Sequence, residues 1–491
     1  MNWDFLTAAH VSLALTLLHV TTVTAIALRV VMRKPPVGVA LAWLLLVSAF
    51  PAFGAGVYLL IGERRVGQRR AERIAKHRAD YRRLSEQGIH HGLTNVNWDR
   101  HHPDARAMNQ LGARLVGVPT VAGSSGRLLT NSEEILRCIA ADIDSATSSV
   151  LMEFYIWNQG GLADEVVAAL IRATKRGVAC RVLVDAIGAR PWWKGEQPAE
   201  LRAAGVKVQQ AFPSGLWQMV FGRNDLRLHR KIVVIDDRIA WTGSMNLVDP
   251  RYFKQDAHCG EWVDAMARME GAVVSPLAMT LIGDWVLETN ESIEEIIDCA
   301  GLDVVEPKGG ADVQVVPSGP IETDDGLLLM LLTLINAARK ELVLTTPYFI
   351  PDESLMRAIR AAAASGVQVH LVLPEKVDSF MARYASRSYY AELMDVGVQI
   401  HLFKRGLLHT KSITVDNCLS MFGTVNLDMR SLWLNYEVSL FLYGEAIATP
   451  IRSLQQSYIQ DSELLSPDEW KKRSLQHRIL ENVLRLTSPL L

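Results

Sequence analysis

Two long apolar stretches, Phe5 to Leu28 and Val37 to Ile61, stand out near the start of the chain because neither contains Asp, Glu, Lys or Arg. About 20 apolar residues suffice to cross a bilayer as a helix. We therefore expect both stretches to span a membrane as a helical hairpin joined by the short link Arg29 to Pro36. A cleaved signal peptide is the alternative for the first stretch, but no basic residue precedes it and its apolar run exceeds the usual length.

The second apolar stretch contains residues that interrupt helices. Pro51 is followed closely by Gly54 and Gly56. Such residues are tolerated in membranes where the freed backbone groups find other partners, so the pattern predicts either a kinked span or a re-entrant element.

A basic segment follows the two stretches. Residues 64 to 83 hold nine Lys or Arg against only Glu72 and Asp80. Because positive charge stays on the cytoplasmic side, we expect both the N-terminus and the large C-terminal part to be cytoplasmic. Each cation near anionic headgroups contributes on the order of 1 kcal/mol, so Arg69, Arg70 and Arg73 are candidate lipid contacts. The alternative is a solvated helical linker.

Beyond residue 115 the pattern alternates between short apolar runs and amphipathic stretches, as expected for strands and helices. A strand, a helix ended by Gly and a second strand occur in this order twice. The two copies cover Val150 to Tyr155, Ala163 to Arg176 and Ala179 to Asp185, then Leu342 to Tyr348, Glu353 to Ser365 and Val367 to Leu373. The repeat predicts a duplicated α/β domain with an approximate twofold axis.

One short motif also occurs twice, as His229-x-Lys231-x4-Asp236 and His409-x-Lys411-x4-Asp416. Both copies continue with the same residue types at the same offsets: Gly243, Ser244 and Asn246, then Gly423, Thr424 and Asn426. His and Lys stand two residues apart, so in a strand both side chains project from one face. If the halves meet along their axis, two imidazoles and two ammonium groups share one pocket.

This set of groups suits attack of an imidazole on a phosphodiester. One His would attack phosphorus while the other protonates the departing alcohol, and Lys231 with Lys411 would offset the negative charge. Hydrogen bonds to the non-bridging oxygens are expected from Ser244, Asn246, Thr424 and Asn426. A divalent ion is disfavoured because a Lys stands where the ion would bind, so we expect no metal.

Each imidazole also needs a carboxylate to fix its tautomer. The candidates are Asp264 and Glu437, on the predicted strands Glu261 to Ala267 and Tyr436 to Tyr443, each downstream of the motif in its own half. The His229 to Asp264 spacing is seven residues longer than that from His409 to Glu437, which makes Asp264 the weaker candidate. Asp236 and Asp416, at the far ends of the motif strands, are expected to be structural.

The duplicated motif resembles that of the phospholipase D superfamily. Longer strings are similar to bacterial cardiolipin synthases of the A type: TGSMNLVDPRYFKQDA (Thr242 to Ala257), TPYFIPDE (Thr346 to Glu353), GLLHTKS (Gly406 to Ser412) and GTVNLDMRSLWLNYE (Gly423 to Glu437). The resemblance implies condensation of two phosphatidylglycerol molecules into cardiolipin and glycerol at the bacterial inner membrane, without metal, nucleotide or other cofactor. It also implies that His229 is the nucleophile and His409 the acid and base.

The expected organisation has four parts. Residues 1–62 form the transmembrane hairpin, 63–115 a basic juxtamembrane linker, 116–306 the first phospholipase D-like half and 307–491 the second. The expected partners are phosphatidylglycerol and anionic membrane lipids, with an oligomer possible and nucleic acid excluded. A hydrophobic content of 49 % with 21 % charged residues is that of a folded protein, and five scattered Cys favour a reducing compartment.

Three other functions share part of this pattern. A membrane-tethered phospholipase D that hydrolyses lipid to phosphatidic acid would share every residue named so far. A nuclease would need a long basic groove with interleaved aromatic residues, and residues 116–491 contain no such stripe. A noncatalytic membrane scaffold conflicts with two complete motifs.

Two further apolar patterns carry expectations. Leu216 to Phe221 forms a cluster that either dips into the membrane interface or belongs to the core. Near the C-terminus, four apolar residues at helical spacing predict a helix docked onto the body. They are Leu475, Ile479, Val483 and Leu486.

Overall fold

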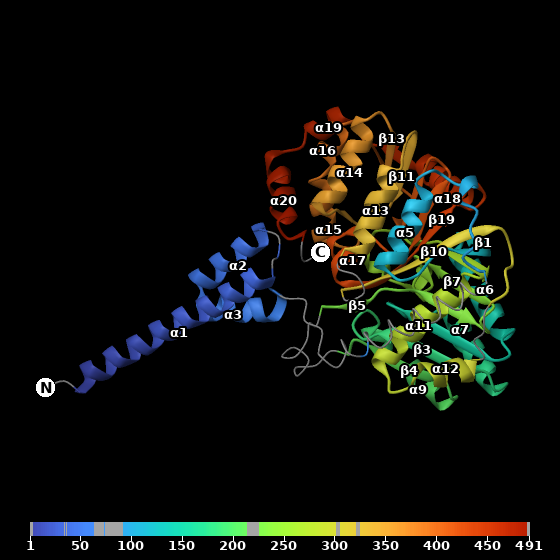
Figure 1. Cartoon of the computed structure of the whole chain (residues 1–491), viewed down its shortest axis with the longest axis horizontal. Helices are drawn as coiled ribbons and strands as arrows, with labels where there is room; N and C mark the ends of the chain where they lie inside the picture. The colour runs from blue at the N-terminus through green and yellow to red at the C-terminus, as the bar shows by residue number, and fades with distance from the viewer. Residues whose placement is uncertain are drawn as a thin grey trace. The chain divides into compact units, whose positions relative to one another are not determined.

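The computed structural model describes residues 3–33, 35, 37–62, 73, 92–213, 225–300, 305–320 and 325–488 (Figure 1). The chain divides into two compact units. One contains Met1–Gln68 with Ser214–Asp225, and the other contains Arg69–Pro213 with Leu226–Leu491.

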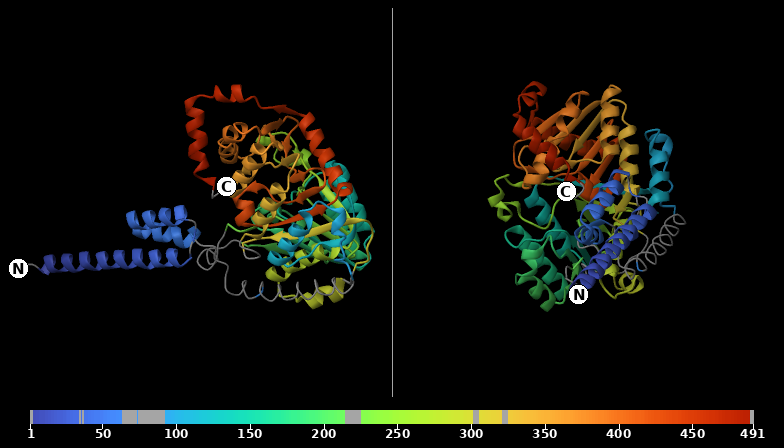
Figure 2. Two further views of the ribbon diagram at one scale, coloured as in Figure 1. Left: turned by 45° about the horizontal axis from the view of Figure 1, so that its top comes forward. Right: turned by 90° about the vertical axis from the view of Figure 1, so that its left-hand side faces the viewer.

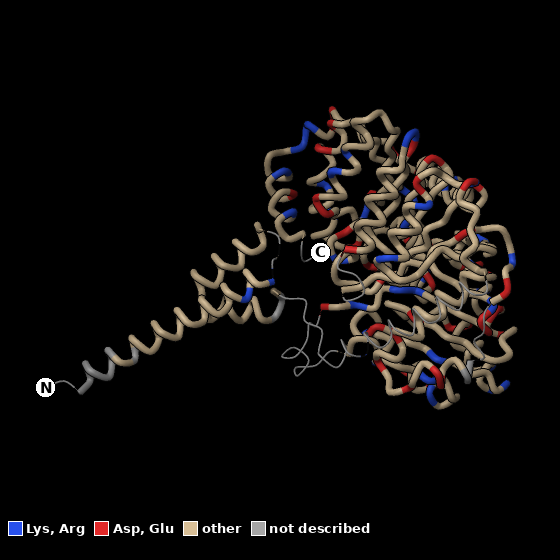
Figure 3. Tube along the Cα trace, viewed as in Figure 1, with Lys and Arg blue, Asp and Glu red and all other residues tan. Residues whose placement is uncertain are grey.

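The N-terminal unit begins with a long apolar helix, α1 (Trp3–Arg33). Its part from Ser12 to Arg33 is long and apolar enough to cross a bilayer. Arg29 and Arg33 lie in its last turns, and the helices of this unit are otherwise almost free of charge along their described length (Figure 3). The first predicted span thus lies within α1.

The second apolar stretch is not one continuous helix, contrary to the predicted span over 37–61. It forms α2 (Val37–Ala49), α3 (Pro51–Val57) and a short π-helix, η1 (Tyr58–Gly62). At 1.5 Å per residue α2 is only about 20 Å long, against the roughly 30 Å of a bilayer core. Pro51 causes the break because it has no N–H with which to continue the helix.

The chain folds back at this break. The rings of Trp43 and Tyr58 lie 5.3 Å apart, edge to face. Gly54 allows this close packing, because a Cβ there would lie 2.8 Å from the Cα of Val47. Among the two sequence-based expectations for Pro51, a kink or a re-entrant element, the structure favours a re-entrant pair of helices.

Most of the basic segment 64–83, and the apolar cluster Leu216 to Phe221, lie outside the described residues. Arg73 is described, and its guanidinium donates hydrogen bonds to the carbonyl of Thr289 (2.9 Å) and to Oδ1 of Asn290 (3.2 Å). These residues directly follow helix α11 (Val274–Glu288). Arg73 therefore has a protein contact in the second unit.

The second unit is built on a 16-stranded mixed sheet. Its first half contributes β1 (Val121–Leu129), β2 (Ser149–Phe154), β3 (Ala179–Asp185), β4 (Lys207–Ala211), β6 (Ile232–Ile235), β7 (Ile239–Gly243), β9 (Met266–Gly271) and the short strand β5 (Arg227–Leu228), which pairs with β19 beside the main strand order. Its second half contributes β10 (Ala311–Ser318), β11 (Glu341–Thr345), β13 (Gln368–Pro374), β14 (Gln399–Phe403), β16 (Ser412–Val415), β17 (Leu419–Gly423), β19 (Asn435–Tyr443) and β20 (Ser462–Leu464).

The strand order carries the predicted twofold symmetry. It runs β20-β14-β13-β11-β16-β17-β19-β10-β1-β9-β7-β6-β2-β3-β4. Outward from the antiparallel pair β1 and β10, the two halves match strand for strand, and β20 is an additional edge strand of the second half. The duplicated α/β architecture is confirmed, and the two halves share one continuous sheet rather than meeting as separate domains.

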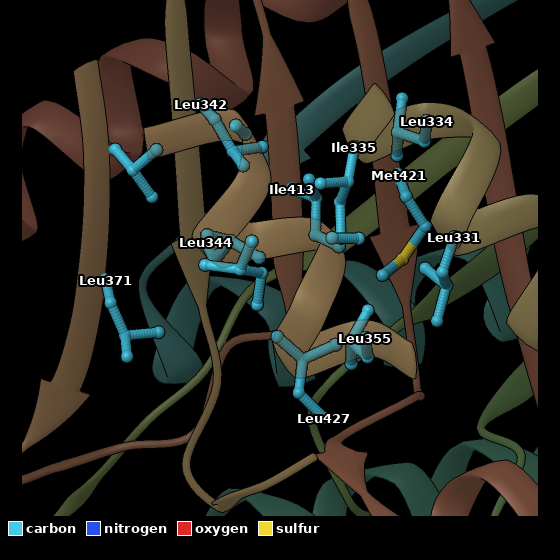
Figure 4. Packing of buried hydrophobic residues seen from close by; sticks show 14 of the residues in the cluster. Leu331, Leu334, Ile335, Leu342, Leu344, Leu355, Leu371, Ile413, Met421 and Leu427 are labelled. Carbon is cyan, nitrogen blue, oxygen red and sulfur yellow. The ribbon is translucent and has the colours of Figure 1, made fainter. Parts of the chain in front are cut away.

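Helices cover both faces of this sheet (Figure 2). They are α5 (Ala105–Leu115), α6 (Ser132–Asp144), α7 (Leu162–Lys175), α8 (Arg190–Trp193), α9 (Gln197–Ala203), α11, α12 (Ile293–Ala300), α13 (Gly326–Asn336), α14 (Glu353–Ala364), α15 (Phe380–Arg387), α16 (Tyr390–Met394), α17 (Met429–Trp433), α18 (Glu445–Gln460), α19 (Pro467–Lys471) and α20 (Leu475–Arg485). In the second half, Leu331 and Leu334 of α13 pack with Leu344, Ile413 and Met421 of the sheet (Figure 4). This dry packing fixes the strands that carry the second motif.

One predicted strand is divided. Glu261 to Ala267 was expected to be continuous, but it forms β8 (Trp262–Val263), a break at Asp264 and then β9. The break arises because β8 pairs with β15 (Leu407–Leu408) of the other half, whereas β9 pairs with β1 and β7 of its own half. Asp264 lies where the chain crosses between these two pairings.

The C-terminal apolar stripe does not dock onto the body, so that expectation is wrong. Its four residues are exposed: Leu475, Ile479, Val483 and Leu486. Helix α20 packs against α15 through its other face, where Glu481 is buried and accepts a hydrogen bond from Arg387. This charged contact and the packing of Leu484 against the core of the second half hold the helix, and the four residues of the stripe stay exposed.

Candidate active site

Each motif histidine is held by backbone contacts from the opposite half. The short strand β5 (Arg227–Leu228) precedes His229 and pairs with β19 of the second half, and the His229 N–H donates to the carbonyl of Tyr436 at 2.9 Å. In the same way β15 precedes His409 and pairs with β8, and the His409 N–H donates to the carbonyl of Val263 at 2.8 Å. Both motifs therefore meet at the junction of the halves.

The orienting carboxylates are exchanged between the halves as a consequence. Nδ1 of His229 lies 2.8 Å from Oε2 of Glu437, and Nδ1 of His409 lies 2.7 Å from Oδ1 of Asp264. The sequence-based expectation that each His uses the carboxylate of its own half is wrong. The strand pairing explains the exchange, because Leu228 is in register with Tyr436 and Leu408 with Val263, so the next residues also face each other.

The two carboxylates are buried and ionised. Burial alone would raise the pKa of Asp264, but His409, Lys411 and Ser244 outweigh it and hold the pKa below its ordinary value. Burial would also raise the pKa of Glu437, but His229, Lys231 and Thr424 outweigh it and hold that pKa below its ordinary value. A carboxylate can only accept here, so Nδ1 of each imidazole carries the proton and Nε2 keeps its lone pair.

Ser244 and Thr424 support these carboxylates instead of a ligand. The Ser244 hydroxyl donates to Oδ1 of Asp264 at 2.6 Å, and the Thr424 hydroxyl donates to Oε2 of Glu437 at 2.6 Å. Both hydroxyls are fully buried. Because a hydroxyl has one proton to donate, the expected hydrogen bond to a phosphate oxygen is not available from either residue.

Asn246 keeps a donor for a ligand, and Asn426 lies at the corresponding place in the second half. The side-chain oxygen of Asn246 accepts from the N–H of Ile156 at 3.1 Å, which fixes the amide and leaves its Nδ2 group as the donor. Oδ1 of Asn426 has no hydrogen-bond partner among the described residues. Both side chains are almost fully buried beside the motifs.

The two lysines are completely buried. Each ammonium donates to the carbonyl of the histidine in its own motif, Lys231 at 2.6 Å and Lys411 at 2.5 Å. Burial lowers the pKa of Lys231 to about 8 and that of Lys411 to about 7. An anion arriving in the site would oppose this loss of charge and stabilise both ammonium groups.

Both imidazoles are neutral near pH 7. Burial lowers the pKa of His229 to about 4 and that of His409 to about 4, and the facing carboxylates only partly counteract it. Lys411 lowers the pKa of His229, and Lys231 lowers that of His409. The cations of both motifs therefore act on both imidazoles, as a single shared site requires.

The motif aspartates bind backbone amides at the far ends of their strands. Asp236 accepts from the N–H groups of Thr147, Ser148 and Ser149 at 2.8 to 2.9 Å. Asp416 accepts from the N–H groups of residues 339, 340 and 341, also at 2.8 to 2.9 Å. Each aspartate ties its motif strand to the neighbouring strand, β2 or β11, and neither contacts an imidazole.

An insertion explains the unequal spacing of the two halves. The extra residues follow Asn246 and form two short turns, η3 (Pro250–Tyr252) and η4 (Gln255–Ala257), before Trp262. The ring of Trp262 lies 4.3 Å from the ring of His409. The His229 ring is packed instead by Tyr155 of its own half, with centroids 5.0 Å apart.

The insertion is fastened to the second half by an ion pair. Nζ of Lys254 lies 2.8 Å from Oδ2 of Asp378, whose other oxygen accepts from the hydroxyl of Tyr348 at 2.6 Å. The same ammonium lies 5.4 Å from the centre of the Trp262 ring. Lys254 adopts a left-handed backbone conformation (φ 48°), which costs energy for a residue with a side chain.

Four further residues lie at the site that the sequence motifs do not single out: Asp185, Lys254, Trp262 and Asp378. The carboxylate of Asp185 accepts from the N–H of Leu228 at 3.0 Å, just before His229, and burial raises its pKa to about 6. The sequence signal for the insertion is the seven-residue difference in spacing, which by itself does not show which carboxylate faces which histidine. Among the described residues, no group of three or more His, Cys, Asp or Glu could hold a metal ion.

Comparison with family models gives two matches. The model described as cardiolipin synthase, PLD-like domain, matches residues 139–262 and 331–458, one match in each half. The model described as phospholipase D-nuclease N-terminal matches residues 22–63, which contain α2 and α3.

Whole-chain comparison gives similar proteins over nearly the full length. Cardiolipin synthase A of Serratia proteamaculans is 42 % identical over 470 residues, covering 96 % of both chains, and that of Yersinia pestis is 42 % identical over 471 residues with the same coverage. Among solved structures, the phosphatidylserine synthase of Haemophilus influenzae aligns with a TM-score of 0.59 at 15 % identity, over 78 % of this chain and 99 % of that one. At this identity the likeness concerns the fold alone.

Proposed function

The chain belongs to the cardiolipin synthases of the phospholipase D superfamily and is an enzyme of the phosphatidyltransferase type. From this premise we propose that it condenses two phosphatidylglycerol molecules into cardiolipin and glycerol through a phosphohistidine. The named relatives and the resemblance of the motif strings support this choice of substrate.

The exchanged histidine–carboxylate pairs are the observation that carries the proposal. Each pair leaves one Nε2 lone pair in a buried site that also contains two ammonium groups and the Asn246 amide. A nucleophile, a second acid–base group and cations for an anionic phosphodiester are what double displacement at phosphorus needs.

In the first step Nε2 of His229 attacks the phosphorus of one phosphatidylglycerol. The bond from phosphorus to the headgroup glycerol oxygen breaks, and Nε2–H of a protonated His409 gives its proton to that oxygen. Free glycerol leaves, and the phosphatidyl group remains on His229. Glu437 stabilises the positive charge that develops on the attacking ring through its hydrogen bond to Nδ1.

His409 must be protonated for this step, although burial lowers its pKa to about 4. The bound phosphodiester anion supplies the missing stabilisation, because a nearby negative charge favours the charged imidazolium. Asp264 adds to this effect through its contact with Nδ1 of His409. The substrate thus helps to generate its own general acid.

In the second step neutral His409 takes the proton from a headgroup hydroxyl of a second phosphatidylglycerol. The hydroxyl oxygen attacks phosphorus, the bond from phosphorus to Nε2 of His229 breaks, and cardiolipin is formed. His409 ends protonated and His229 neutral, as at the start of the cycle. Lys231 and Lys411 offset the phosphate charge throughout.

Transfer requires that the lipid hydroxyl outcompete water. The insertion supports this, because Trp262 covers His409, the group that would activate water as readily as an alcohol. The ion pair of Lys254 with Asp378 keeps the insertion against the second half. Membrane attachment through α1 raises the local concentration of the lipid acceptor.

The experiment that tests the proposal is a product assay. Purified enzyme in vesicles of phosphatidylglycerol should yield cardiolipin and glycerol in equal amounts, and His229→Ala and His409→Ala should each abolish both products. Phosphatidic acid as the sole lipid product would instead identify a phospholipase D, and unchanged synthesis by either variant would reject the mechanism.

A further inference from the structure

Helix α20 presents an apolar stripe to its surroundings. The exposed fractions of Leu475, Ile479, Val483 and Leu486 are 67 %, 54 %, 52 % and 81 %. These positions are four, four and three residues apart, so they lie along one face of the helix. Large apolar side chains exposed in a continuous row mark an interaction surface.

The stripe is held in a fixed orientation. On the opposite face of the helix Glu481 is 1 % exposed and accepts from Nε of Arg387 at 2.9 Å. Arg485 donates to Glu392 at 2.5 Å, and its guanidinium lies 4.3 Å from the centre of the Tyr389 ring. These contacts come from α15, α16 and the residue between them, so α20 is attached to the second half and is not a loose tail.

The charged residues near the stripe indicate which kind of surface it binds. The exposed residues of α20 include Arg478 but no Asp or Glu, since the only acid of the helix is the buried Glu481. Lys471 and Lys472, just before the helix, are exposed as well, as are Asp468 and Glu469 before them. An apolar face bordered by cations is the composition of helices that lie in the surface of anionic membranes.

We propose that α20 lies in the interface of an anionic phospholipid bilayer, with its stripe among the upper acyl chains and its cations at the headgroups. The same chain carries an apolar helix able to cross a bilayer, so such a surface is within reach of the second unit. The inference rests on the proposed function in one respect, namely that the bilayer that α20 contacts is also the source of substrate.

The consequence concerns the orientation of the catalytic unit. A helix fixed rigidly to α15 cannot enter the interface without turning the whole second half with it. Each exposed cation contributes on the order of 1 kcal/mol near an anionic surface. A second attachment of this kind restricts the rotation that a single spanning helix leaves free.

The test places a fluorophore on the stripe of the full-length protein in phosphatidylglycerol vesicles. Ile479→Cys carries an environment-sensitive label, in a chain whose native cysteines are replaced and whose activity has been verified. Lipids with a spin label high on the acyl chain serve as quenchers. The matched control is Arg360→Cys, on the polar exposed face of α14.

The expected result is a blue-shifted emission at position 479 that the lipid quencher reduces severalfold, with position 360 unaffected. Emission at 479 that the quencher leaves unchanged would overturn the proposal, whether the stripe meets water, another part of the chain or a second copy. Quenching requires no turnover, so cardiolipin formation by the unmodified enzyme tests the proposed function separately.

Discussion

At the scale of single residues, the site depends on side chains that are far apart in sequence. Glu437 holds His229, and Asp264 holds His409. Ser244 and Thr424 hold the two carboxylates in turn. Neither half alone contains a histidine with its carboxylate, so duplication here produced two interdependent halves of one site.

The exchanged pairs predict that the two carboxylate variants impair different steps of the reaction. A phosphatidyl ester of p-nitrophenol has a leaving group that needs no proton, so its burst reports on the attacking histidine alone. We expect Glu437→Gln to suppress the burst, and Asp264→Asn to keep it while slowing turnover roughly 10²- to 10⁴-fold. The measurement is a stopped-flow burst with alkaline quenching and mapping of the phosphohistidine. Mapping to His229 together with a burst lost only in Asp264→Asn would contradict the exchange.

The buried lysines predict the pH dependence. Below pH of about 4 the attacking imidazole becomes protonated, and above about 7 to 8 first Lys411 and then Lys231 lose their protons. The general acid His409 has a pKa of about 4 and takes up its proton with the substrate. The value of kcat/KM should therefore fall below pH of about 4, decline with pH above it, and decline more steeply above about 7 to 8. Bound phosphate raises the pKa of both lysines, so the basic limb of kcat should lie at higher pH than that of kcat/KM. A kcat/KM that stays constant up to pH 10 would show that these ammonium groups are not needed.

At the scale of elements, the insertion distinguishes the two halves. The segment that follows Asn246 is longer than the corresponding segment after Asn426. The longer segment places Trp262 against His409, and no corresponding residue packs on His229 in this way. A site with exact twofold symmetry would give both histidines the same surroundings. The insertion therefore offers a physical reason for the two imidazoles to take different roles.

The ion pair that fastens the insertion predicts a change in product ratio. Lys254→Met should loosen the cover over His409 and raise the ratio of phosphatidic acid to cardiolipin severalfold, because water then reaches the activating base. The ratio is measured by chromatography of lipid products. Lys404→Met is the matched control, since Lys404 forms a similarly exposed ion pair with Glu375 at 2.7 Å. A lower rate with an unchanged ratio in Lys254→Met would remove the insertion from the choice between transfer and hydrolysis.

Elements with a strong local pattern could be predicted from sequence, and those set by distant partners could not. The strand Ala179–Asp185 and the helix Glu353–Ala364 follow apolar periodicity alone and match their predicted bounds within a residue. The break at Asp264 arises from pairing with a strand about 145 residues away, which no local pattern reports. An exposed stripe on α20 has the same spacing as a buried one, so periodicity could not tell protein from lipid as its partner.

At the scale of the whole molecule, the second apolar stretch changes the expected topology. Hydropathy counts apolar residues, and it does not register that Pro51 turns the chain back after α2. If α1 spans the bilayer and α2 with α3 re-enters it, the chain leaves α3 on the same side of the membrane as the end of α1. We therefore propose a cytoplasmic catalytic unit with the N-terminus on the opposite face, instead of both on one face.

This topology is open to a direct measurement. A periplasm-dependent reporter fused before Trp3 should be active in a bacterial inner membrane, and the same reporter fused after the second half should be inactive. Activity of neither fusion, with both ends protected from external protease, would show that 37–61 crosses the membrane after all.

The shared sheet places both histidine motifs in one rigid frame, and the central claim is that they act in turn on a single phosphorus atom. The stereochemistry at phosphorus tests it most directly. With a phosphatidylglycerol made chiral at phosphorus by sulfur substitution, two successive displacements predict retention of configuration in the cardiolipin product. Inversion would mean that the acceptor hydroxyl attacks the lipid directly, and it would contradict the phosphohistidine account.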